Sequence, residues 1–326
     1  MTTEYYDDPE LADLAARLRD DDAAVRRIAL LDLADLDGDA HVPLLLAALD
    51  DASAPVRTEA ARALEAFESP ASVRGLARLL SDPDAGVRAA AAQSLSELKR
   101  PASAQELLPY IGAIDPFVRA AALRGVRELR VPDSFAPALA ALDAPDPLVR
   151  REAVTVLGYL KRADALAALT RLATRDPEPD VRRAAAGALG YAEDVPPAVL
   201  AALLAALADA AWQVREEAAT TLGKLRPADA APALIAALDD AYWQVRLRAA
   251  RSLGRLKSRA ALPGLVAALA HPISNLRKEA ALALGEIGAP DALPALRGAE
   301  NDPDPEVRKS VRLALQQIGN ATGDAA

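Results

Sequence analysis

The chain has 326 residues, a formal net charge of −9, two His and no Cys. The lack of Cys excludes disulfides, thiolate metal sites and thiol catalysis, and it is compatible with the cytoplasm, where we expect the protein. We expect neither a secretory signal nor a membrane span, since no uncharged apolar run is as long as a membrane helix, which needs about 18 residues. The negative net charge disfavours a general nucleic-acid binder.

A ten-fold repeat runs through the chain. The dipeptide Val-Arg recurs at steps of 31 to 33 residues from Val25-Arg26 to Val307-Arg308, and Leu276-Arg277 fills the one gap. A period of this length that stays in register over nearly the whole chain is typical of solenoid proteins.

Each unit predicts two helices joined by a short turn. The first helix often has Pro in its first turn, as at Pro43, where a missing N–H costs nothing. The second helix keeps apolar residues at the marker Val and four and eight residues later, as at Val149, Ala153 and Leu157, which is one stripe of an α-helix. Several units have Gly nine residues after the marker, which we interpret as a site of close helix packing inside the last turn.

Stacking such units buries the stripes in one continuous core, so we expect an all-α fold, a curved α-solenoid of about ten two-helix repeats. We expect a single domain over residues 1–319 and a flexible tail over 320–326. Two irregularities interrupt the pattern. Pro109 falls inside the first helix of unit four and should shorten or kink it, and Pro196-Pro197 lies in the longest unit.

The segments "DPEPDVRRAAAGALGYA" from Asp176 and "NLRKEAALALGEIG" from Asn275 resemble HEAT-like repeats of the phycobilin-lyase type. The resemblance covers nearly the whole chain. It implies an α-solenoid, and it implies functions as diverse as bilin lyase subunits, phycobilisome-degradation factors, a di-iron hydroxylase and bacterial scaffold proteins.

The hydroxylase of this repeat type relies on repeated His-Glu pairs, which this chain lacks. His41 and His271 are not followed by Glu and lie seven to eight units apart, too far to share a metal. We therefore expect no metal, no cofactor and no catalytic residues. Both His are interpreted as solvated or turn residues, and His271 stands where other units have Asp.

A ladder of ion pairs is predicted between adjacent units. Asp recurs five residues before the marker, as at Asp51, Asp209 and Asp240, and Arg follows the marker in every unit. Asp–Arg pairs with charge-assisted hydrogen bonds would hold the stack in register.

The residues two and six positions after the marker form a stripe that, by the resemblance, lines the concave surface. Eight of these twenty residues are basic and one is acidic, although the chain has 38 basic and 47 acidic residues. The alternative is that these Arg pair with neighbours such as Glu59, Glu152 or Glu279. The stripe residues that we assign to partner binding are Arg183, Glu216, Leu247, Arg251 and Lys278.

Two Trp stand on the same side of adjacent units. Trp212 and Trp243, with Tyr242 beside the second, occupy a position that is Ala or Pro in most units, so the fold does not require an aromatic residue there. Trp is enriched at binding hot spots, which predicts a partner site. The alternative is that each ring packs on the loop of its neighbour.

These features favour a non-catalytic, monomeric scaffold, adaptor or assembly factor. We expect its concave face to bind a protein partner through an acidic, partly apolar segment. The first alternative is a bilin lyase or other cofactor-transfer subunit, whose bilin propionates would suit a basic groove. The second is nucleic-acid binding along the basic row, which we consider less favoured and which predicts affinity that falls steeply with salt.

Overall fold

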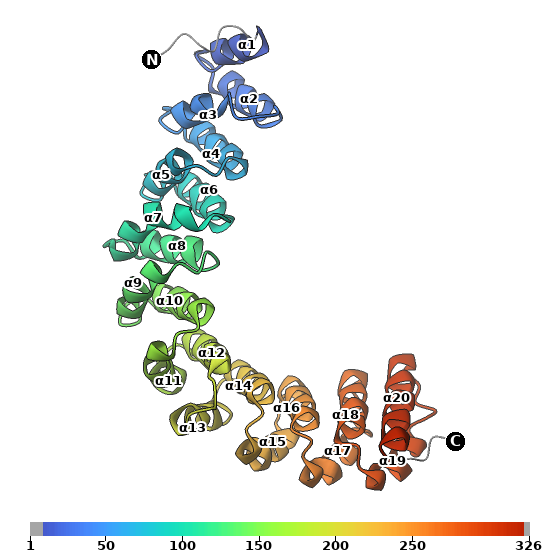
Figure 1. The fold of residues 1–326 in the computed structure, drawn as a ribbon. Helices are drawn as coiled ribbons and strands as arrows, with labels where there is room; N and C mark the ends of the chain where they lie inside the picture. The colour runs from blue at the N-terminus through green and yellow to red at the C-terminus, as the bar shows by residue number, and fades with distance from the viewer. Residues whose placement is uncertain (1–8, 323–326) are drawn as a thin grey trace. The chain divides into compact units, whose positions relative to one another are not determined.

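The computed structural model describes residues 9–322, which form twenty α-helices joined by turns and short 3₁₀ segments, with no strand among them. They divide after Leu160 into two compact units, called unit 1 and unit 2 below. The predicted all-α repeat is confirmed. Within each unit the odd-numbered helices are the first helices of the repeats and the even-numbered helices are the second (Figure 1).

Unit 1 contains five repeats. Its helices are α1 Pro9–Arg17, α2 Ala23–Ala34, α3 Val42–Ala48, α4 Ala54–Ala63, α5 Pro70–Leu79, α6 Ala85–Ser96, α7 Ala104–Leu107, α8 Pro116–Val126, α9 Phe135–Ala141 and α10 Pro147–Leu160. The shortest of them, α7, ends two residues before Pro109 and continues as a 3₁₀ segment over Leu108–Gly112, so the shortening predicted for Pro109 is confirmed.

Unit 2 contains the other five repeats. Its helices are α11 Leu166–Arg175, α12 Pro179–Ala188, α13 Pro197–Ala206, α14 Trp212–Leu225, α15 Ala231–Ala236, α16 Trp243–Arg255, α17 Leu262–Ala268, α18 Ser274–Ile287, α19 Leu293–Gly298 and α20 Pro305–Thr322. Helix α20 continues three residues past the predicted end of the solenoid at 319, and residues 323–326 lie outside the described part of the chain. A single domain over 1–319 stays a prediction.

The core of each unit is made by the predicted stripes. Val149, Val214 and Val245 are all fully buried, as are Leu157 and Leu222 eight residues after two of them. In unit 2 the even-numbered helices α12 to α20 pack directly on one another in one row, so each stripe is covered by the next repeat. No single helical hairpin provides this burial for itself.

Glycines set the distance between neighbouring second helices. A Cβ built on Gly223 would lie 2.9 Å from the Cα of Ser252, and one on Gly254 would lie 2.8 Å from the Cα of Ala283. Both distances are shorter than real Cβ contacts, so only Gly allows this approach. The interpretation of these Gly as close-packing sites inside the last turn is confirmed.

A left-handed residue lies three positions after the close-packing Gly, just beyond α14, α16 and α18. Arg226 and Lys257 have φ of 57° and 51°, and Gly288 takes the same place with φ of 69°. This position was not predicted from the sequence, because Gly is the usual residue of a left-handed cap and Arg226 and Lys257 stand there instead.

Candidate protein-binding surface

An aromatic cluster of Trp212, Arg215 and Tyr242 lies where α14 meets the turn before α16. The rings of Trp212 and Tyr242 stack with centroids 5.4 Å apart and an interplanar angle of 14°. The guanidinium carbon of Arg215 lies 5.7 Å from the centroid of the Tyr242 ring, within the range of a cation–π interaction. Tyr242 is 45% exposed and Trp212 is partly exposed, so the cluster presents aromatic surface to solvent.

The two Trp lie in equivalent places but in different surroundings. Each is the first residue of a second helix, Trp212 of α14 and Trp243 of α16, and each is partly exposed. Trp212 stacks on Tyr242 in the turn of the next repeat, so for this ring the alternative of packing on a neighbour's loop also applies. Leu247, one turn into α16, is partly exposed as well.

Ion pairs engage two of the Arg side chains on the second helices of unit 2. Arg251 donates to Glu279 through Nε at 2.7 Å and Nη2 at 3.0 Å, and Glu279 is buried. Arg248 donates to Glu216 at 3.0 Å. The weighed alternative, pairing with a neighbouring Glu, therefore holds for the stripe residue Arg251 at Glu279. Arg248 lies one position off the stripe and pairs with the stripe residue Glu216.

Three further charged residues lie on second helices of unit 2: Lys278, Arg183 and Glu217. Lys278 is partly exposed and makes no ion pair within residues 9–322, while exposed Arg183 has only a loose contact of 3.5 Å with Asp180. Sequence reasoning missed Glu217. Burial raises the pKa of this carboxyl, partly offset by the charges of Arg183 and Arg248. Gly187 of α12 gives it room, because a Cβ there would lie 2.7 Å from Glu217 Oε1.

The predicted ladder is confirmed in both units. Arg215 donates Nε and Nη2 to the two carboxylate oxygens of Asp240 at 2.6 and 2.9 Å, and its Nη1 donates to the carbonyl of Asp209 at 2.8 Å. Asp240 Oδ1 also accepts the N–H of Tyr242 at 2.8 Å. Four other rungs share this geometry: Arg26–Asp51, Arg57–Asp82, Arg182–Asp209 and Arg277–Asp302.

One rung of unit 2 is interrupted at His271. Its Nδ1 accepts the N–H of Ile273 at 3.1 Å, which is the local role that Asp240 Oδ1 fills one repeat earlier, so the predicted turn role is confirmed. Burial lowers the pKa of His271, and the charges of Arg246 and Arg277 lower it further. His271 is therefore neutral at neutral pH, and Arg246 lacks the carboxylate that its counterparts bind.

His41 has a different environment from the predicted one. It lies in the turn before α3, but it is only 1% exposed, and its ring packs edge-on against Phe67 with centroids 4.8 Å apart. Its Nε2 has no hydrogen-bond partner, and burial lowers its pKa. The interpretation as a solvated residue is wrong because Phe67, which did not enter the sequence reasoning, covers the ring.

Acidification should lower the free energy of unfolding in two stages. His41 and His271 have lowered pKa values in the fold, so below about pH 6.5 the unfolded chain binds protons that the folded chain does not. Hydrogen bonds from Arg215 and its counterparts lower the pKa of Asp240 and Asp302, so their stabilising contribution is lost only below the ordinary Asp range. Urea midpoints measured across both ranges should show both stages, and a His41→Phe/His271→Asn variant should lose the first.

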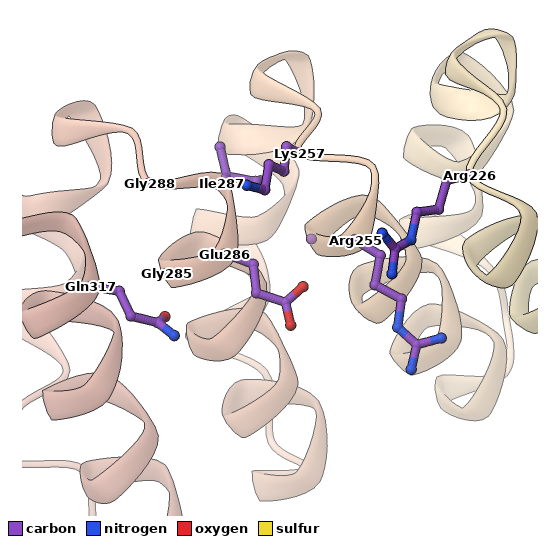
Figure 2. A pocket seen from close by; sticks show the side chains of 9 residues that line it. Arg226, Arg255, Lys257, Gly285, Glu286, Ile287, Gly288 and Gln317 are labelled. Carbon is purple, nitrogen blue, oxygen red and sulfur yellow. The ribbon is translucent and has the colours of Figure 1, made fainter. Parts of the chain in front are cut away.

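An open cavity of about 580 Å³ lies at the opposite ends of the second helices of unit 2. It is lined by Arg226, Gly254, Arg255, Lys257, Gly285, Glu286, Ile287, Gly288 and Gln317. Figure 2 shows the Arg226 and Arg255 side chains approaching it from one side, with Glu286 and Gln317 on the other. Trp212 is the first residue of α14, and Arg226 follows its last residue. At the rise of an α-helix these two residues are about 20 Å apart, so the cavity is separate from the aromatic cluster.

Residues 9–322 contain no cluster of three or more His, Asp or Glu suited to hold a metal. Within the same span, every helix is too short or too polar to traverse a bilayer. The absence of a cofactor and of catalysis stays a prediction.

A family model for HEAT repeats matches the chain almost from end to end. The matched segments overlap and cover residues 11–96, 42–127, 74–142, 106–190, 135–210, 172–246, 200–275 and 231–316. No curated protein matches the sequence.

Solved structures with this fold include three of different kinds. An engineered protein is 23% identical, with 95% of this chain and 98% of that chain covered and a TM-score of 0.52. The Escherichia coli protein YibA is 20% identical, with 89% and 94% covered and a TM-score of 0.53. Yeast importin-β (Kap95p), in a structure with RanGDP, is 16% identical, with 95% and 50% covered and a TM-score of 0.67, so this chain spans about half its length.

Proposed function

Because the chain belongs to the HEAT-repeat family, we propose that it is a non-catalytic scaffold, adaptor or assembly factor that binds a protein partner. The observation that carries the proposal is the aromatic cluster. Trp212 is partly exposed and Tyr242 is exposed, and most other repeats have no aromatic residue at these two positions. Kap95p, whose solved structures include complexes with RanGDP and Nup1, is a solenoid of this fold that binds proteins.

The binding surface extends from the aromatic cluster along α14, α16 and α18 of unit 2. The close packing of α14, α16 and α18 in one row supports a continuous concave face there. Trp243 and Leu247 add partly exposed apolar area, and Lys278 adds a cation without an ion pair in the described chain. A partner segment that is acidic and partly apolar matches both features.

The internal ion pairs weaken the two alternative functions. Bilin propionates and nucleic-acid phosphates would both need a freely available basic groove. Arg248 and Arg251 are engaged by Glu216 and Glu279, and Arg251 has its Nε and Nη2 on a buried carboxylate. Protein binding through aromatic residues does not depend on these cations.

Replacement of the cluster residues should weaken partner binding. A display library of random peptides, selected on the wild-type protein, provides the ligand, and we expect selected peptides to contain Asp or Glu beside apolar residues. Trp212→Ala and Tyr242→Ala should each weaken the binding of such a peptide by about 1–3 kcal/mol, as truncated hot-spot residues do. Lys278→Glu should act mainly on the association rate and its salt dependence.

Leu313→Ala is the matched control, because Leu313 is also apolar, 44% exposed and on a second helix of unit 2, but lies in α20. Its binding should be unchanged, and helix content should be unchanged in all variants. The chain has only two Trp, so their fluorescence reports directly on this region. Emission that acrylamide cannot quench, or a loss of affinity in Leu313→Ala but not in Trp212→Ala, would contradict the proposed surface.

A further inference from the structure

In a complete rung all three nitrogens of the Arg guanidinium donate hydrogen bonds. Arg215 binds both oxygens of Asp240, and its third nitrogen donates to a carbonyl of its own turn. The carboxylate also accepts a backbone N–H from the turn in which it lies. The same arrangement recurs at Arg277 and Asp302, so it defines how a carboxylate sits between two repeats of unit 2.

Arg246 has the same place in α16 but not the same partners. Its Nε donates to the carbonyl of Asp240, and its two Nη atoms have no acceptor within the described chain. His271 stands 25 residues on, where the ladder places Asp. Because His271 Nδ1 accepts a backbone N–H, its neutral ring carries the proton on Nε2. The gap is therefore supplied with donors and lacks an acceptor.

The interrupted rungs of unit 1 differ from this gap. Arg88 has the ring of Phe117 at 5.9 Å from its guanidinium carbon, and its Nη1 donates to two carbonyls. Arg119 donates its Nε to the carbonyl of Ile111, and the corresponding residue after it is Ala144, whose side chain offers no donor. His271, by contrast, places a second donor beside Arg246, and because it is partly exposed an anion from outside can reach the gap.

We infer that the gap between Arg246 and His271 is a carboxylate-binding site, in which an Asp or Glu side chain of the partner completes the rung. The carboxylate takes the place that Asp240 and Asp302 occupy in neighbouring rungs, accepting from Arg246 Nη atoms and from His271 Nε2. The site lies beside the turn that carries exposed Tyr242, so a partner residue next to the acid meets aromatic surface. This inference rests on the proposed function and states the chemistry that the surface recognises.

Two substitutions of His271 test the site. His271→Asp supplies an internal carboxylate and closes the gap, whereas His271→Asn keeps an oxygen for the Ile273 N–H but brings no charge and leaves the gap open. We expect His271→Asp to raise the folding equilibrium constant about tenfold, the lower end for a hydrogen bond to a charged group. A destabilised His271→Asp variant would refute the equivalence with the complete rungs.

Sodium acetate is the first probe, compared with sodium chloride at equal ionic strength in thermal unfolding. A site with a Kd of about 50 mM would raise the folding equilibrium constant about fivefold in about 200 mM acetate. Wild type and His271→Asn should show this acetate-specific gain, and His271→Asp and Arg246→Gln should not. An equal response of wild type and His271→Asp would overturn the inference.

The selected acidic peptide is the second probe. It should bind wild type and His271→Asn, and it should bind His271→Asp at least tenfold more weakly, since the internal carboxylate occupies the site. If Trp212→Ala loses the peptide while His271→Asp retains it fully, the inference fails and the proposed function stands. If acetate discriminates the variants but no peptide is selected, the carboxylate site stands and the proposed function fails.

Discussion

Val149→Asp should lower the free energy of unfolding by about 3–5 kcal/mol, because it places an unpaired charge among apolar side chains. Val149 lies in α10, is fully buried, and belongs to the stripe on which the repeat register was assigned. In a stack where each repeat contacts only its neighbours, the damage should remain near unit 1 and appear as a separate early unfolding transition. Calorimetry and urea unfolding measure both features.

Leu148→Asp is the matched control for this substitution. Leu148 precedes Val149 in the same helix but is 36% exposed, so its Asp variant keeps the charge in contact with water. We expect a change within about 1 kcal/mol for Leu148→Asp. A melting curve of Val149→Asp that matches the wild type would show that the register of the stripes is wrong.

Gly223→Ala should destabilise unit 2 by about 2–3 kcal/mol, although Ala is the better helix former. The added Cβ would lie 2.6 Å from the Cβ of Ser252 and 2.1 Å from its Oγ, so α14 and α16 would have to separate. That movement also strains the hydrogen bond from Ser252 Oγ to the carbonyl of Ala219. Thermal unfolding measures the loss.

Two further variants separate crowding from other effects. Gly298→Ala, where an added Cβ meets nothing within 4 Å, should leave stability unchanged or raise it. In the double variant Gly223→Ala/Ser252→Gly, the side-chain atoms in conflict are removed, so the two changes should cost less together than their sum. Strict additivity would show that the crowding at Gly223 is not the cause.

Most of the fold followed from local pattern. The repeat of Val-Arg, the stripes around Val149 and the Pro at 109 each express a rule that acts within one helix or between adjacent repeats. The left-handed cap did not follow, because Arg226 and Lys257 carry no mark of that conformation. The close-packing Gly were recognised from their place before the last apolar position, and the distances to Ser252 and Ala283 give the reason for them.

The candidate site was less predictable because its contacts depend on side-chain direction. Sequence counting found a basic stripe, but it did not decide that Arg251 binds Glu279, since that choice depends on the geometry between α16 and α18. The pairing of Trp212 with Tyr242, rather than with Trp243, also depends on the offset between repeats. The sequence identifies His271 as a substitute for Asp, but the orientation of Arg246, whose Nε donates to the carbonyl of Asp240, depends on the local geometry.

The ladder also gives the chain a direction during synthesis. In most rungs the Arg comes first and the Asp follows 25 residues later, as with Arg215 and Asp240. A growing chain that folds as it emerges would therefore expose one unmatched guanidinium at its advancing end until the next repeat arrives. Each complete rung is therefore closed by the repeat that follows it, and α14 gains the carboxylate that neutralises Arg215 only when the turn before α16 has formed.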